Sequence, residues 1–463
     1  MQTGLGNFPS INELLESPPL KSLVDRVNPS RVMTSVRTFV DGMRQELQSA
    51  VTQRQIPSPI VLAEQIAQWI MRQEQSGVRS VLNATGIVLH PELGGAPLAD
   101  EALTAMRAAA GSYSCVPGSS TGGGSTHVEQ LLQKMIGCEA ALVTANPSLA
   151  IALVANVLAC GRDVIVPRCQ LATNSEGSRT YELIVAAGGR LREIGSINEL
   201  TLNDLGDVDD AAFLFWQQGL PFELAGQQQS ADLMQVATWA NRRSLPLVVD
   251  LGNGGIHDLA SFGIHAQPTA IAALQAGASA VIIRGDGLLG GPACGIIAGR
   301  NSLLTRLTSH PACRAAGCDK TTLAAVEATL ELYQSAAEQQ PSSIERAIPL
   351  LGLLATSPDN LKHRSERLAP QLAASPALAA VEARSDFAYL TNAKLESQKL
   401  STWGLSLQPA QGTAADLLVS LSNTTPAVIG SLAGGRVWLD LRTISPREDQ
   451  QLVQAINQLP ASR

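Results

Sequence analysis

The sequence predicts an α/β fold in which helices cover both faces of a mostly parallel sheet. Between residues 139 and 284, five short apolar runs are bounded by polar or turn residues, and helix-length segments separate them. Hydrophobic residues make up 45% of the 463-residue chain and charged residues 16%, which suits a globular protein with a sizeable core. This alternation is typical of parallel strands that are joined by crossover helices.

Residues 1–78 are expected to form a small helical module. Ser10 is followed three residues later by Glu13, which is the capping-box pattern of a helix start. Apolar residues then recur at helical spacing over 32–51 and over 60–71. The polar segment 74–80 predicts a linker to the next domain.

Residues 79–338 are expected to form the large α/β domain. Its strands are predicted at 139–144, 163–167, 211–216, 245–250 and 280–284. Helices are predicted between them, for example over 150–158 and 230–243.

Residues 339–463 are expected to form a smaller α+β domain, because the polar segment 339–343 marks a boundary. Helices are predicted over 344–355, 414–419 and 446–459. Strands are predicted over 380–383 and 436–442.

Charge and cysteine content narrow the function classes. The net charge is −7, whereas nucleic-acid binding favours a basic surface, so no DNA partner is expected. No stretch reaches about 18 uninterrupted apolar residues, so no membrane-spanning helix is predicted. The seven cysteines form no C-x-x-C pair, which is typical of free thiols in a reducing cytoplasm. Cys313, Cys318 and His310 do not complete a zinc spacing, and no metal is expected.

A predicted strand leads into Ile-Arg-Gly-Asp-Gly-Leu-Leu-Gly-Gly-Pro at 283–292, which resembles the cofactor segment of the bacterial selenocysteine synthases, the L-seryl-tRNA(Sec) selenium transferases. Further segments resemble this family in the same order: 82–90, 92–98, 127–132, 138–143, 161–166, 248–254 and 310–330. The resemblance implies fold-type I of the pyridoxal-phosphate (PLP) enzymes, with PLP as cofactor. It also implies a cytoplasmic homodimer or ring of dimers, and tRNA(Sec) as a partner.

The resemblance also assigns roles to individual positions. The family holds PLP as a Schiff base on a lysine whose position is Gly287 in this sequence, and glycine has no amine. Asp250 matches the carboxylate that pairs with the pyridine nitrogen, although a turn-forming role is the alternative. Asp286 and Arg179 match other cofactor-binding positions, and Arg314 matches an anion-binding arginine.

Several basic positions of the family are replaced in this chain. Gly95 and Gly317 stand where the family has anion-binding arginines, and Gln218 and Glu223 stand where it has a histidine and an arginine. The loop 116–126 has no basic residue; it is either a plain flexible loop or an anion site made of backbone amides. Their joint loss indicates that the anion site disappeared together with the lysine.

Different function classes follow from this pattern. One is the family's conversion of seryl-tRNA(Sec) to selenocysteinyl-tRNA(Sec). The hypothesis that we favour is a catalytically degenerate homologue with a binding, regulatory or scaffold role. A third is a PLP-dependent lyase with lysine-independent chemistry, against which stands the usual loss of rate when such a lysine is removed.

Overall fold

The computed structural model describes residues 9–24, 29–49, 58–74, 77–114, 126–171, 173, 179–206, 210–220, 231–256, 258–265, 267–338, 343–392 and 395–459. Two of the segments singled out above, Glu223 and most of the loop 116–126, lie outside these ranges. The chain forms two compact units, residues 1–80 and residues 81–463. A further division of the second unit at residue 338 remains a prediction.

The first unit contains four described helices: α1 (Ile11–Leu15), α2 (Pro18–Val24), α3 (Pro29–Ser49) and α4 (Pro59–Glu74). Ser10 caps α1 as predicted, since its hydroxyl accepts a hydrogen bond from the Glu13 amide at 3.2 Å. The apolar faces of the helices meet in one core that includes Leu14, Val36 and Ile66. The two predicted helical segments are therefore confirmed as α3 and α4.

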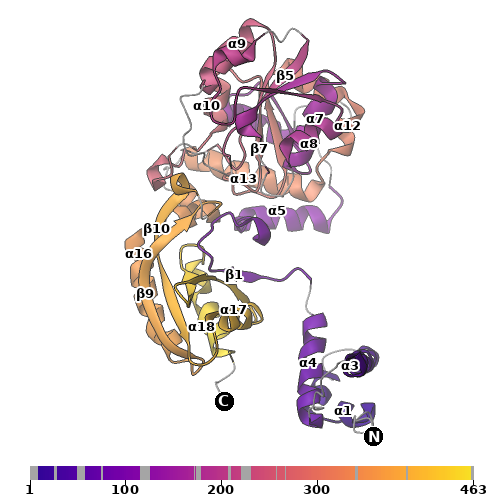
Figure 1. Ribbon diagram of the computed structural model, residues 1–463. Helices are drawn as coiled ribbons and strands as arrows, with labels where there is room; N and C mark the ends of the chain where they lie inside the picture. The colour runs from indigo at the N-terminus through magenta and orange to yellow at the C-terminus, as the bar shows by residue number, and fades with distance from the viewer. Residues whose placement is uncertain are drawn as a thin grey trace. The chain divides into compact units, whose positions relative to one another are not determined.

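The second unit contains a seven-stranded sheet with the strand order β2-β8-β7-β6-β5-β3-β4. Figure 1 labels two of its strands, β5 and β7, which lie among helices. The strands are β2 (Ala140–Thr144), β3 (Asp163–Pro167), β4 (Arg190–Ile194), β5 (Ala211–Gln217), β6 (Leu247–Asp250), β7 (Ala280–Arg284) and β8 (Gly295–Gly299). Neighbours from β4 to β7 run parallel, and β8 is antiparallel to both β7 and β2. The mostly parallel sheet and all five predicted strands are confirmed.

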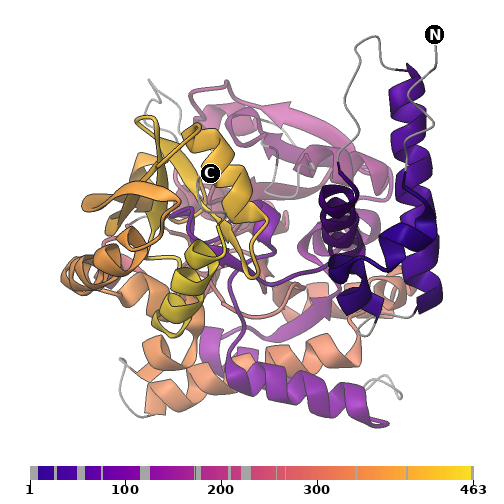
Figure 2. The ribbon, with the colours of Figure 1, turned by 90° about the horizontal axis from the view of Figure 1, so that it is seen from below.

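The alternation of side chains along the central strands explains why both faces of this sheet are buried. On β5, Phe213 and Phe215 enter one hydrophobic core, whereas Leu214 and Trp216 enter the core on the opposite face. The helices of this region are α5 (Asp100–Gly111), α6 (His127–Ile136), α7 (Pro147–Leu158), α8 (Thr180–Ala186), α9 (Leu233–Arg242), α10 (Ala270–Gln275), α11 (Asn301–Ser309), α12 (Pro311–Ala315) and α13 (Lys320–Glu338). Figure 2 shows α5 in purple alongside α13 in pale orange, and these two helices are in contact.

A four-stranded antiparallel sheet, in the order β12-β13-β10-β9, dominates the C-terminal part. Its strands are β9 (Leu378–Tyr389), β10 (Lys399–Pro409), β12 (Ser431–Ala433) and β13 (Arg436–Asp440), while β1 (Val81–Asn83) pairs separately with β11 (Ala427–Ile429). The helices are α14 (Ile344–Ala347), α15 (Pro349–Ala355), α16 (Pro358–Ala373), α17 (Ala414–Ser422) and α18 (Asp449–Asn457). The helix predicted over 344–355 is in fact two helices, because Pro349 disfavours a helical conformation for Ile348.

Among the described residues, no helix is long and apolar enough to cross a membrane. The cysteines within the described ranges, Cys138, Cys160, Cys169, Cys294, Cys313 and Cys318, are free thiols.

Candidate functional site

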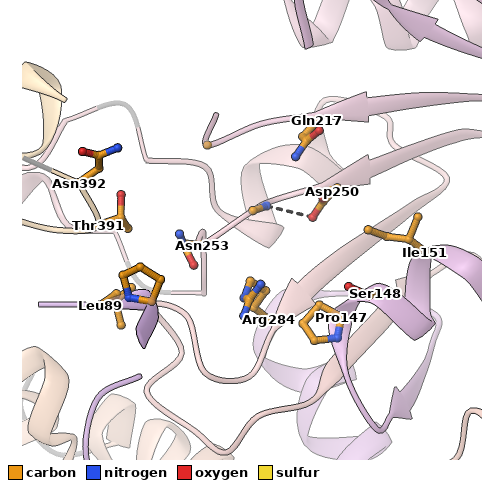
Figure 3. A pocket seen from close by; sticks show the side chains of 13 residues that line it. Leu89, Pro147, Ser148, Ile151, Gln217, Asp250, Asn253, Arg284, Thr391 and Asn392 are labelled. Carbon is orange, nitrogen blue, oxygen red and sulfur yellow. Dashed lines mark hydrogen bonds between the residues drawn. The ribbon is translucent and has the colours of Figure 1, made fainter. Parts of the chain in front are cut away.

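A cavity of about 220 Å³ lies where the parallel strands β5, β6 and β7 end (Figure 3). These strands end at Gln217, Asp250 and Arg284, and all three side chains line the cavity. The remaining lining residues are Leu89, Pro91, Pro147, Ser148, Ile151, Gly219, Gly252, Asn253, Thr391 and Asn392. The carboxyl edge of a parallel sheet is the usual place for a ligand site in this class of fold.

Asp250 is the buried carboxyl group of this cavity, with 6% of its surface exposed. Its Oδ1 accepts a hydrogen bond from the Gly252 amide at 3.0 Å, and its main-chain oxygen accepts one from Gln218 at 2.8 Å. Burial raises the pKa of the Asp250 carboxyl to about 6, although the Gly252 amide and the Arg284 charge act in the opposite direction. Asp250 therefore lies at the strand end expected of the carboxylate that pairs with the pyridine nitrogen, and it also makes the turn contact expected of the alternative, turn-forming role.

Arg284 brings a positive charge into the cavity that sequence reasoning did not single out. Its Nε and Nη2 donate to the two carboxylate oxygens of Asp286 at 3.3 and 3.2 Å, in a two-point ion pair that is largely buried. Asp286 itself is not among the residues that line the cavity. Its carboxylate is oriented by Arg284 within the turn that follows β7.

Gly287 lies in that same turn, packed against the main chain of Asn253. A β-carbon built at residue 287 would lie 3.0 Å from the Asn253 carbonyl oxygen and 3.3 Å from the Arg284 β-carbon. The same Asn253 oxygen accepts a hydrogen bond from the Leu288 amide at 2.9 Å, which holds it in place. Any side chain at 287 therefore requires its surroundings to move by a few tenths of an ångström.

Gly95 is close to this turn although it is distant in sequence. Its φ of +83° lies in the left-handed region that favours glycine. A β-carbon there would contact the main-chain oxygen of Asp286 at 3.4 Å. The Gly95 position thus lies beside the segment that contains Gly287.

The structure does not bring the two predicted arginines, Arg179 and Arg314, into the cavity. Arg179 precedes α8, is exposed, and pairs with Glu182 at 3.2 Å. Arg314 lies exposed on the short helix α12, where Gly317 follows and pairs with Thr144 across an isolated bridge. Neither arginine lines the cavity, and their functional roles remain predictions.

Several residues that line the cavity were not predicted from the sequence, for different reasons. Gln217 ends an apolar strand just as Asp250 does, so the same signal could have found it; its amide donates to the Gln170 Oε1 at 2.8 Å. Pro147 and Ser148 begin α7 after the Asn146 cap, which is a recognisable helix start. Thr391 and Asn392 follow β9, and nothing local indicates that they reach this cavity.

A group of possible metal-binding side chains lies elsewhere, between the start of α6 and α13. The ligating atoms of His127, Glu327 and Glu331 lie within 4.8 Å of one another. His127 and Glu331 are exposed, and they form an ion pair with each other at 3.4 Å if the histidine is protonated. This arrangement is that of a surface ion-pair cluster.

The seven-stranded sheet and the helices around it define an α/β protein with the aminotransferase-like fold known as fold-type I. The solved D-glucosaminate-6-phosphate ammonia-lyase shares this fold with a TM-score of 0.58, at 18% identity, covering 84% of this chain and 97% of that chain. Residues 81–445 match the family model "L-seryl-tRNA selenium transferase".

Two full-length relatives agree with that match. The L-seryl-tRNA(Sec) selenium transferase of Moorella thermoacetica is 33% identical over 461 residues, covering 98% of this chain and 96% of the relative. That of Klebsiella pneumoniae (strain 342) is 32% identical over 453 residues, covering 94% and 95%. The chain therefore belongs to the L-seryl-tRNA selenium transferase family.

Proposed function

We propose that this chain is a selenocysteine synthase homologue that has lost the transferase reaction and acts in binding or regulation. The observation that carries the proposal is Gly287, which we assign to the position of the family's PLP lysine. Glycine cannot form an aldimine, and the close Asn253 carbonyl leaves little room for a side chain. The glycines at 95 and 317 support the same conclusion, because arginines at these positions would supply anion contacts.

The residues present fit only part of a PLP site. Asp250 suits the ring nitrogen, because a buried carboxylate there keeps the nitrogen protonated. No residue at 287 supplies the amine, so the described residues do not fit covalently held PLP. We therefore derive no catalytic step through the cofactor.

A second candidate function is an active transferase or lyase with lysine-independent chemistry. What favours it is that the cavity remains open and still contains Asp250 with a pKa of about 6, which suits proton transfer near neutral pH. It requires PLP to bind without covalent attachment. The two candidates differ in whether the purified protein contains or takes up PLP.

An absorbance scan between roughly 330 and 430 nm, before and after borohydride, separates these candidates. We expect no cofactor band and no mass increase on this chain after reduction. PLP trapped covalently on the unmodified chain would overturn the proposal that the transferase reaction has been lost. PLP that binds tightly but is not trapped by borohydride would favour the second candidate.

The assignment of residue 287 has its own test. Gly287→Lys should become labelled by PLP and borohydride, with the label on residue 287 by peptide mass analysis. Gly111→Lys, on an open position at the end of α5, is the matched control and should remain unlabelled. Label on residue 287 would support the assignment and would mean that the rest of the PLP pocket still works, whereas absence of any label would mean that the pocket itself has decayed.

We also propose the family's cellular setting and partners for this chain: a cytoplasmic homodimer or ring of dimers, with tRNA(Sec) as a possible ligand. The net charge of −7 opposes tRNA binding, because affinity for nucleic acid depends on basic groups that neutralise phosphates. Gel shifts with seryl-tRNA(Sec) at several salt concentrations test it, since binding through phosphates must weaken as salt rises. Absent or salt-insensitive binding would remove this partner.

A further inference from the structure

A second cavity, of about 310 Å³, lies at the amino-terminal ends of the parallel strands β6 and β7, whereas the first cavity lies at their carboxyl ends. Leu245 and Pro246 precede β6, Ser279 precedes β7, and Arg300 follows the antiparallel strand β8. The other lining residues are Asn241, Ser244, Ser302, Leu303 and Arg306. The cavity shares no lining residue with the strand-end cavity around Asp250, so it is a separate site.

The lining of this cavity has an excess of positive charge. It contains Arg300 and Arg306 and no carboxylate, on a chain whose net charge is −7. Glu139 lies outside this lining, and its carboxylate accepts a hydrogen bond from the Asn301 amide at 2.8 Å, at the start of α11. The cavity therefore presents a local positive field on an otherwise acidic protein.

The two arginines are arranged differently. Arg300 is held in place, because its Nη2 donates to the Asn241 Oδ1 at 2.8 Å, and Asn241 in turn donates to the Gly277 carbonyl at 3.1 Å. Arg306 is exposed and makes no hydrogen bond or ion pair with any residue in the described ranges. One guanidinium is thus oriented and the other is available to a ligand.

Hydroxyl groups complete the polar lining. Ser302 and Arg306 are four residues apart on α11, so they lie on the same face of that helix. Ser279 is buried, and its Oγ accepts from the Leu247 amide at 3.1 Å, which leaves its own proton to donate. Ser244 adds a third hydroxyl to the lining.

We propose that this cavity binds the phosphate group of a small phosphorylated compound. A phosphate monoester carries close to two negative charges at neutral pH, which two guanidinium groups match, and its oxygens accept several hydrogen bonds. The volume exceeds what a phosphate group alone requires, so it also accommodates the organic part of a small ester. No carboxylate in the lining opposes such an anion.

Calorimetric titration of the full chain at low ionic strength tests the proposal, with ribose 5-phosphate, inorganic phosphate and uncharged ribose as probes. We expect ribose 5-phosphate to bind and ribose not to bind. Binding of inorganic phosphate with equal affinity would identify the free anion as the ligand, whereas tighter binding of the ester would identify a phosphorylated metabolite. Arg306→Gln should weaken binding about tenfold or more. Ser302→Ala should weaken it by a smaller factor.

Two control variants make the result specific. Arg107→Gln removes an exposed arginine of α5 that has no partner among the described residues, and it should leave the affinity unchanged. Arg284→Gln removes the cation of the strand-end cavity and should also leave it unchanged. The proposal is overturned if neither phosphate probe binds, if Arg306→Gln binds as tightly as the unmodified chain, or if Arg284→Gln abolishes binding.

Discussion

At the scale of single residues, Gly287 combines a chemical and a steric property. It lacks the amine that a Schiff base requires, and its α-carbon lies so close to the Asn253 carbonyl that a β-carbon would be 3.0 Å away. The turn around it is held by the Leu288 amide bonded to the same carbonyl and by the ion pair between Arg284 and Asp286. These contacts indicate a turn that is packed around glycine.

Gly287→Ala should therefore destabilise the protein, by about 1–3 kcal/mol, because the added methyl group must displace the Asn253 main chain. Urea unfolding monitored by circular dichroism measures this change. Gly111→Ala is the matched control: nothing lies within 4 Å of its added β-carbon, and alanine favours a helix, so its stability should stay equal or rise. Equal effects of the two substitutions would show that residue 287 is not packed as described.

Asp250 makes stability depend on pH. Its folded pKa of about 6 exceeds the unfolded value of about 3.9, so between these values the unfolded chain loses a proton that the folded chain retains. Stability from this group is complete below about pH 4 and falls as pH rises to about 6. Burial also raises the pKa of the Asp440 carboxyl to about 6, so Asp440 makes stability fall with rising pH in the same way.

Asp250→Asn should flatten this dependence and raise stability at pH 7, by on the order of 2 kcal/mol, because the amide keeps the oxygen that accepts from Gly252. Urea unfolding at pH 4, 5, 6 and 7 measures the effect. The exposed Asp258, changed to Asn, is the control and should leave the slope as it was. If the free energy of unfolding changes with pH between 4 and 6 in the same way with and without Asp250, the pH dependence does not come from the Asp250 carboxyl.

At the scale of elements, the buried side chain of Arg364 joins α16 to the chain that follows the C-terminal sheet. Arg364 donates to Asp449 at 2.6 Å, to the Leu441 carbonyl at 3.1 Å and to the Ile444 carbonyl at 2.9 Å. It therefore joins α16 to the segment after β13 and to the start of α18. Asp449 also accepts a hydrogen bond from Arg367, which is largely exposed.

These two arginines form a matched pair for mutation, since they contact the same carboxylate from buried and exposed positions. Arg364→Met should cost roughly 3–5 kcal/mol, because it leaves Asp449 and two carbonyl groups without their buried partner. Arg367→Met should cost about 1 kcal/mol or less, as exposed ion pairs do. Chemical unfolding compares them, and similar losses for both would argue against a buried anchor.

The sequence predicted regular elements better than irregular ones. The five apolar strands were predictable because both of their faces are buried, whereas β4, with Arg190, Arg192 and Glu193, lies at the sheet edge and lacks such a run. β8 begins and ends with glycine, which weakens its strand signal. β9 extends over twelve residues, but its polar outer positions restricted the prediction to 380–383.

At the scale of the whole molecule, the two compact units should be separable. Within the described part of the first unit, the hydrophobic core draws only on residues between 11 and 70, and the family model begins at residue 81. A chain of residues 81–463 should therefore unfold with the same midpoint as the second unit of the full chain. Val36→Asp in the full chain tests the same independence, since it should unfold the first unit alone. A shared shift of both transitions would contradict it.

The assembly is a second property of the whole molecule. We expect light scattering to give a mass of at least twice the 48.6 kDa of one chain, as for the dimers typical of fold-type I proteins. Dilution should not dissociate the assembly at micromolar concentration if a large interface holds it. A particle of 48.6 kDa under these conditions would exclude the homodimer proposed for this chain.

The sequence alone determined the α/β class, the parallel strands and the presence of Gly287 in a motif that resembles the PLP-lysine segment, because these depend on local patterns and on residue identity. Only the tertiary structure decided that Gln217, Asp250 and Arg284 meet at one cavity with Thr391 and Asn392. It alone placed Arg179 and Arg314 outside that cavity and Gly95 beside Asp286. Such contacts join residues hundreds of positions apart, and they depend on how strands and loops pack, which no local pattern encodes.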